Sequence, residues 1–206
     1  MRYTKYWLNA AQLNRAGLMN AILTGSTAET FKPDHRLIQQ CGGRWEPLRL
    51  LDFGCGLGRN VPGYSVQWSV TLYDSLPMLM RAVTYLREQN LAIWPMMTNN
   101  WDALKTQKFD AVLASLVFQH ILEPDLIEYL KDLRHMTKRL VVFGRRFNDG
   151  GGNTWEIVNR YWEPVESFVI EGDPHGHDTV VFRPRSIFDY ESFRRLLSWL
   201  GLNTSM

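Results

Sequence analysis

The chain has 206 residues, of which 45% are hydrophobic, enough for one domain with a sizeable core. Lys and Arg number 23 and Asp and Glu 21, so a formal net charge of +2 supplies no strong field for a nucleic acid or a membrane surface. Two cysteines, no apolar run long enough to span a bilayer and no leader-like start predict a cytoplasmic protein with no disulfide framework and no membrane anchor.

Two helices are predicted before the first strand. Apolar residues recur at helical spacing over residues 3–23, with Tyr3, Tyr6 and Trp7 crowded at the beginning. A second helix is expected over residues 28–40, because Pro33 falls near its first turn and two glycines follow its end.

A short apolar run, Leu48–Phe53, predicts a buried parallel strand, because it lacks the alternation of a half-exposed one. It ends in three glycines at alternate positions, 54, 56 and 58, which let the backbone turn sharply and a ligand approach closely. Asp52 precedes them, where a carboxylate can hold the loop's own amides or a cationic ligand group. A loop for a dinucleotide pyrophosphate would avoid that charge.

A second run, residues 70–74, also ends in an acid, Asp74. An acid at the tip of the strand beside a glycine loop is where a ribose diol is bound. Together these segments resemble the class I S-adenosylmethionine-dependent methyltransferases, whose acid and three-glycine motif appears here as Asp52, Gly54, Gly56 and Gly58. The resemblance implies that S-adenosylmethionine is the cofactor and that Asp74 binds its ribose, with Cys55 and Ser75 in the same two loops.

The resemblance also implies contacts for the adenine and for the acceptor. The family commonly has an acid near the end of the third strand for the adenine amino group, and this chain has Asn100 there, followed by Trp101. Asp102 is interpreted as a helix N-cap or a solvated acid. In the family an N-terminal segment often covers the cofactor, so Tyr3, Tyr6 and Trp7 either contact the substrate or pack on the sheet edge.

The middle of the chain alternates predicted strands and helices, which indicates a Rossmann-like, doubly wound and mostly parallel sheet. Pro62-Gly63 interrupts the helix expected after the glycine loop, so this helix should be short or irregular. Pro95 places the third strand at an edge or a bulge. The expected elements are a helix over 77–89, a strand over 92–97, a strand over 109–115, a helix that begins at Glu123 and a strand over 139–144.

Residues 115–120 lie at the end of the fourth strand, and ligands bind outside the carboxyl ends of parallel strands, so Ser115 is expected to contact the cofactor and Gln119 the substrate. His120 is the candidate general base, because neutral histidine accepts a proton near pH 7; the alternative is a histidine that bonds the backbone. Arg145 is a candidate for binding an anionic substrate, or a solvated surface residue.

Three interpretations stay open for residues 148–206: a lost terminal hairpin, two last strands supplied in changed order by residues 168–182, or a substrate cap. The cap is the favoured interpretation, with a last helix over 186–200. The predicted organisation is one domain: N-terminal helices over 1–45, a cofactor-binding core over 46–147 and a cap with the last helix over 148–206.

The sequence therefore predicts a methyltransferase that uses S-adenosylmethionine and acts on an oxygen or nitrogen of a small molecule, without a metal. We expect no nucleic-acid partner and no membrane, and the sequence leaves the oligomeric state open. The alternative is a non-catalytic S-adenosylmethionine-binding protein with an interaction or regulatory role.

Overall fold

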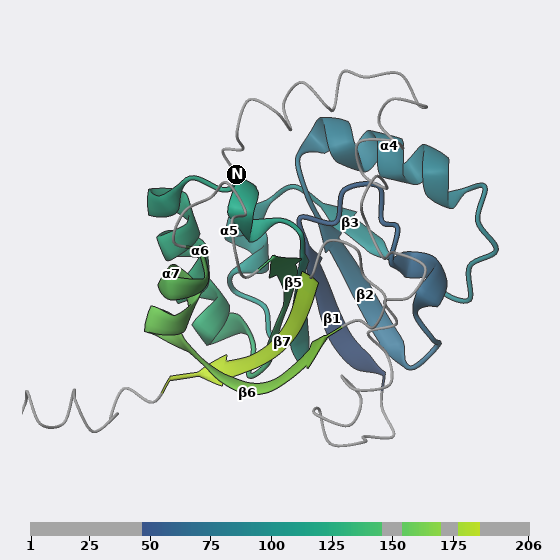
Figure 1. The fold of residues 1–206 in the computed structure, drawn as a ribbon. Coiled ribbons are helices and arrows are strands. Elements are labelled where there is room, and N and C mark those ends of the chain that lie inside the picture. The colour runs from purple at the N-terminus through teal and green to yellow at the C-terminus, as the bar shows by residue number, and fades with distance from the viewer. Residues whose placement is uncertain (1–46, 146–153, 170–176, 186–206) are drawn as a thin grey trace, which may run out of the picture.

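The computed structural model describes residues 47–145, 154–169 and 177–185. Seven strands of the described residues form one sheet in the order β3-β2-β1-β4-β5-β7-β6 (Figure 1). The strands are β1 (Leu48–Phe53), β2 (Trp68–Tyr73), β3 (Met96–Thr98), β4 (Ala111–Ser115), β5 (Leu140–Arg145), β6 (Trp162–Val169) and β7 (His177–Pro184). The first five run parallel, which confirms the predicted Rossmann-like sheet.

Helices cover both faces of this sheet. On one face, α4 (Leu76–Leu86) packs on β1 and β2 through Leu79 and Leu86. On the other lie α5 (Trp101–Leu104), α6 (Glu123–Met136) and α7 (Thr154–Tyr161), as Figure 1 shows. Neighbouring residues of β1 point into opposite cores, so the strand is buried on both faces and its apolar run has no alternation.

The connection from β1 to β2 holds no α-helix. After the glycines the chain makes turns and then one 3₁₀ turn, η1 (Val61–Gly63), whose second residue is Pro62. Proline lacks an amide donor and glycine adds backbone entropy, so a longer helix is disfavoured here. The prediction of a short or irregular helix is confirmed.

The strands of the carboxyl-terminal part extend the main sheet. β7 runs antiparallel between β5 and β6, and its residues Val180, Val181 and Phe182 are all buried. β6 forms the edge, where Pro164 and a bulge are tolerated because one side of the strand needs no ladder partner. The region expected to form a cap thus contains two sheet strands, and of the three interpretations the structure has the added strands, over 162–184 rather than 168–182.

Some predictions concern residues outside the described ranges. These are the helices over 3–23, 28–40 and 186–200. Among the described helices, none is long and apolar enough to cross a membrane.

Candidate functional site

The three glycines form a tight bend at the carboxyl end of β1. Gly54, Gly56 and Gly58 have φ angles of 69°, 58° and 73°, in the left-handed region that favours glycine. The amides of Gly54 and Cys55 both donate to the carbonyl of Tyr73, at 2.8 and 3.2 Å. The bend is therefore held against the end of β2, the neighbouring parallel strand.

Asp74 holds the same bend from β2. Its Oδ2 accepts a hydrogen bond from the Gly56 amide at 2.8 Å, and its Oδ1 accepts one from the Ser75 amide at 2.6 Å. The residue is 5% exposed. The structure thus brings Asp74 and the glycine bend together; Ser75 is the N-cap residue of α4.

Asp52 lies beneath the bend in a buried polar cluster. Its Oδ2 accepts from the Tyr64 hydroxyl at 3.1 Å and from the Asn60 amide at 3.4 Å, whereas its Oδ1 has no partner among the described residues. Burial raises the pKa of the Asp52 carboxyl to about 6, although both hydrogen bonds and the positive charge of Arg59 act in the opposite direction. The side chain is 1% exposed, so its negative charge is poorly solvated at neutral pH.

The segment after β4 closes the site from the other side. Val117 packs against the bend so tightly that a Cβ on Gly54 would lie 2.1 Å from its Cγ2. Leu116 has a φ of 56°, uncommon for a residue with a side chain and a source of backbone strain. Ser115 accepts a hydrogen bond from the Arg59 guanidinium at 2.9 Å. The ends of β1 and β4 are therefore joined through side chains.

His120 ends the 3₁₀ turn η2 (Phe118–His120), which follows β4 directly. It is half-buried, and burial lowers the pKa of its imidazole to about 4. The ring is therefore neutral at physiological pH. Gln119, also half-buried, lies in the same turn.

The adenine candidates have structural contacts of their own. Asn100 is the N-cap of α5, since its side chain accepts from the Ala103 amide at 3.1 Å. Asp102 is therefore not the cap; it is exposed and pairs with Lys105 at 2.6 Å, as expected of a solvated acid.

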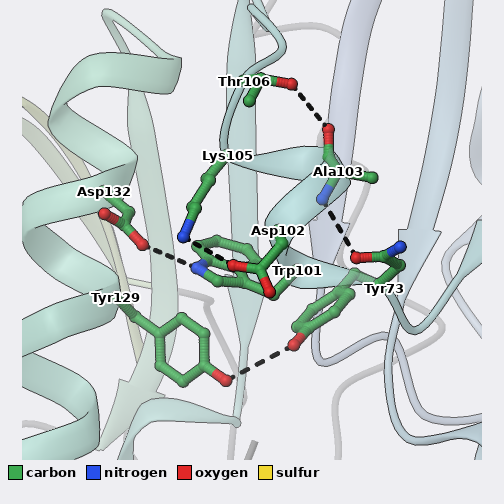
Figure 2. Close-up of polar contacts among 9 residues, drawn as sticks. Tyr73, Trp101, Asp102, Ala103, Lys105, Thr106, Tyr129 and Asp132 are labelled. Atoms are coloured by element: carbon green, nitrogen blue, oxygen red, sulfur yellow. Dashed lines mark hydrogen bonds and ion pairs between the residues drawn. The ribbon is translucent and has the colours of Figure 1, made fainter.

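The indole of Trp101 belongs to an aromatic cluster on the α6 side of the sheet. Figure 2 shows its nitrogen directed at Asp132, to which it donates at 2.7 Å, and the facing hydroxyls of Tyr73 and Tyr129, 3.4 Å apart. Its ring centroid lies 5.1 Å from that of Tyr73 and 4.7 Å from that of Tyr129. Within the described part of the chain, the ring contacts of Trp101 are all made in this cluster, with Phe53, Tyr73 and Tyr129, so packing accounts for its position.

The predicted substrate contacts are less fully described. Tyr3, Tyr6 and Trp7 lie outside the described residues, and the structure gives Arg145 a backbone position at the end of β5. The sequence reasoning missed Arg59, Asn60 and Tyr64 around Asp52. The sequence signal that could have identified these three residues was Pro62-Gly63. This pair interrupts the helix expected there and so keeps the residues after the last glycine in a loop near the strand ends.

A family model described as a methyltransferase domain matches residues 51–140, which include the glycine bend, Asp74 and the segment after β4. No curated protein sequence matches the chain.

Several solved structures share its fold. Magnesium protoporphyrin IX methyltransferase from Synechocystis, with bound S-adenosylmethionine, is 17% identical with a TM-score of 0.56, covering 84% of this chain and 85% of that one. A TehB-like S-adenosylmethionine-dependent methyltransferase from Corynebacterium glutamicum is 20% identical with a TM-score of 0.54, covering 88% and 99%. The 16S rRNA methylase ArmA is 14% identical with a TM-score of 0.59, covering 86% and 94%.

Proposed function

Because the chain carries the methyltransferase domain of the class I S-adenosylmethionine-dependent enzymes, we propose that it transfers a methyl group to an oxygen or nitrogen of a small molecule. S-adenosylmethionine is the cofactor of this family, and the Synechocystis relative holds it in its crystal structure. The class of the methyl acceptor is the part that we propose, and it is argued from the residues around the glycine bend.

The observation that carries the proposal is the contact between the loop that follows β1 and the residue that follows β2. The glycine bend and the Asp74 carboxylate meet through a 2.8 Å hydrogen bond at the carboxyl ends of parallel strands, where open α/β sheets bind ligands. The residues fit the cofactor, because the glycines present backbone without side chains and Asp52 keeps one buried oxygen without a partner among the described residues. A cationic group of the ligand would satisfy that oxygen.

The proposal assigns cofactor contacts to the two loops. Asp74 accepts hydrogen bonds from the ribose hydroxyls through its carboxylate oxygens, while it continues to hold the bend. Asp52, with the backbone from Gly54 to Gly58, faces the amino-acid part of the cofactor. Asn100, at the carboxyl end of β3, retains its amide NH₂ donors and a second lone pair on its oxygen for the adenine edge.

The segment after β4 is assigned to the acceptor. When bound, the cofactor supplies a methyl group already activated by its sulfonium, so the protein's main task is to hold the acceptor in line. Such positioning can supply roughly 7 to 11 kcal/mol of the barrier. Gln119 orients the acceptor, and the neutral imidazole of His120 accepts a hydrogen bond from its hydroxyl or amine. Ser115, which accepts from Arg59 beside the glycine bend, is assigned to the cofactor.

One experiment tests the cofactor before the acceptor. We expect S-adenosylmethionine and S-adenosylhomocysteine to raise the melting temperature of the purified full chain, and NAD to leave it unchanged, because only a ligand of the folded state stabilises it. Stabilisation by NAD alone would contradict the proposal.

The second stage measures transfer of a labelled methyl group to a panel of small hydroxyl and amine compounds, with ribosomal RNA as a separate arm because an rRNA methylase has the same fold. Transfer to a small molecule is the expected result. Transfer to RNA alone would overturn the small-molecule assignment. Tight cofactor binding with no product from any acceptor would instead favour a non-catalytic cofactor-binding protein, for which the single turn η1 in place of a helix is the supporting observation.

A further inference from the structure

Two charged side chains beneath the glycine bend have atoms without partners. Asp52 is 1% exposed, and its Oδ1 has no hydrogen bond within the described part of the chain. The Nη1 of Arg59 is likewise buried and unpartnered there, whereas its Nη2 donates to Ser115. Buried polar atoms are nearly always hydrogen-bonded, because leaving one unsatisfied costs about 1 to 3 kcal/mol or more for a charged group.

These two charges do not satisfy each other. Each carries its own neutral partners, Ser115 for the guanidinium and Tyr64 with Asn60 for the carboxylate. Their electrostatic influence is nevertheless mutual, since the positive charge of Arg59 lowers the pKa of Asp52. Asn60, which directly follows Arg59 in the chain, donates to Asp52, and Arg59 itself donates to Ser115, so both charged side chains lie at the carboxyl ends of the neighbouring strands β1 and β4. A ligand with both charges on one small group would satisfy both.

The short connection after β1 gives the guanidinium a particular importance. In many nucleotide folds the loop leads into an α-helix whose first amides and dipole attract an anionic group. Here the loop is followed by turns and the three-residue η1, so the connection from β1 to β2 presents no α-helix N-terminus after the glycines. Arg59 directly follows the last glycine, and it supplies a fixed positive charge at that place.

We propose that Arg59 is a specificity-determining residue that, together with Asp52, selects ligands carrying an α-amino acid group. The guanidinium donates to the ligand carboxylate, and the Asp52 carboxylate accepts from the ligand ammonium. The inference rests on the proposed function, and it adds the residue that distinguishes the whole cofactor from the bare nucleoside.

The test is calorimetric binding of two probes to the full chain. S-adenosylhomocysteine carries the α-amino acid group, and 5′-methylthioadenosine lacks it but keeps the adenine, ribose and sulfur. Arg59→Gln should weaken S-adenosylhomocysteine binding by about 10- to 100-fold, as expected for a lost hydrogen bond to a charged group, and change 5′-methylthioadenosine binding by less than about 2-fold. Arg87→Gln, at an exposed arginine that follows α4, is the matched control and should change neither.

The outcomes separate the two proposals. If the unmodified protein binds neither probe, the proposed function itself fails. If it binds both and Arg59→Gln weakens them equally, or weakens neither, the assignment of Arg59 is overturned. Should Arg59→Gln not fold, Arg59→Lys tests the same point, because it keeps the charge but loses the planar two-donor geometry; an unchanged preference for S-adenosylhomocysteine in a folded Arg59→Lys protein would contradict a carboxylate-binding guanidinium.

Discussion

At the scale of single residues, the candidate site requires glycine where a side chain would have no space. Gly54 combines a left-handed φ of 69° with a neighbour, Val117, that fills the position of a Cβ. Gly63 lies only nine residues further on, yet a Cβ there would meet nothing within 4 Å. The same residue type is therefore required at one position and replaceable at the other.

This contrast predicts the stabilities of two variants. Gly54→Ala should lower the free energy of unfolding by about 2 to 4 kcal/mol, from the left-handed backbone and the forced displacement of Val117. Gly63→Ala should change it by less than about 1 kcal/mol, and in the stabilising direction, because alanine reduces the entropy of the unfolded chain. Urea denaturation of both variants measures the difference, and equal stabilities would show that the bend does not need glycine at position 54.

Because the Asp74 carboxylate is the proposed ribose contact, its removal should weaken cofactor binding. Asp74→Ala removes the proposed ribose acceptor and also the acceptor of the Gly56 amide. We expect S-adenosylmethionine binding to weaken by about 1.5 to 3 kcal/mol. The control is Asp102→Ala, an exposed acid paired with Lys105, which should leave affinity unaltered. Titration calorimetry showing the same affinity for Asp74→Ala and the unmodified protein would remove Asp74 from the ribose site.

At the scale of elements, the segment that follows β4 joins the glycine bend to the proposed acceptor side. Leu116 keeps a left-handed φ at a cost of about 1 to 2 kcal/mol, and its neighbours Ser115 and Val117 contact Arg59 and Gly54. Strain of this kind persists only where the surrounding contacts over-determine the backbone. We infer that the segment is rigid, so that His120 is presented in one position.

Because His120 is proposed to contact the acceptor and not the cofactor, its substitution should affect kcat without affecting cofactor binding. His120→Ala should lower kcat by roughly 10²- to 10⁴-fold, the usual contribution of a positioned general base, and leave the affinity for S-adenosylmethionine within about 2-fold. His135→Ala, at an exposed histidine in the last turn of α6, should alter neither quantity. Single-turnover kinetics and calorimetry on the same preparations measure both, and an equal loss of affinity and kcat would assign His120 a structural role.

The parallel strands could be predicted from sequence because their signals are local. The buried run of β1, the glycines and the acid at the end of β2 all lie within 27 residues, and α6 begins at Glu123 as predicted. The position of β7 depends on a contact between residues far apart in the sequence, because α7 and β6 separate β7 from its antiparallel partner β5. A run such as residues 179–182 suits a central strand or a buried hairpin equally, so only the pairing register decides.

The site was predictable to the same extent. Asp52, Asp74 and the glycines follow from a motif, whereas Arg59, Asn60 and Tyr64 were missed because their contacts depend on how the chain turns after the last glycine. Trp101 was expected at the adenine, but an aromatic residue at that position has no pattern that distinguishes a ligand contact from packing. In the structure its ring packs with Phe53, Tyr73 and Tyr129.

At the scale of the whole molecule, the sheet separates two apolar cores, and Asp52 is a charge buried at the carboxyl end of the inner strand β1. Its neighbours that carry or can carry charge are Arg59, Tyr64, Cys55 and Asp74. The thiol of Cys55 stays neutral because burial raises its pKa. Burial raises the pKa of the Asp52 carboxyl to about 6, against 3.8 when exposed, although the hydrogen bonds from Asn60 and Tyr64 and the charge of Arg59 lower it.

This shift predicts how the stability of the ligand-free protein depends on pH. A raised folded-state pKa means that the folded protein binds the proton more tightly, so the contribution is complete below pH 3.8 and lost as the pH rises through 6. From pH 7 to pH 5, Asp52 should add about 1.4 kcal/mol to the free energy of unfolding. His120 acts in the opposite direction over this range, because its lowered pKa favours the unfolded state as the pH falls.

The variant Asp52→Asn isolates the contribution of the carboxyl, because His120 titrates equally in both proteins and the asparagine oxygen can still accept from Tyr64. The unmodified protein should gain about 1.4 kcal/mol relative to Asp52→Asn between pH 7 and pH 5, measured by urea denaturation without ligand. The same pH dependence in both proteins would mean that the buried carboxyl keeps an ordinary pKa. The proposed pairing with a ligand ammonium requires a negative charge on the buried Asp52. That result would mean that this charge does not measurably lower the free energy of unfolding of the ligand-free protein.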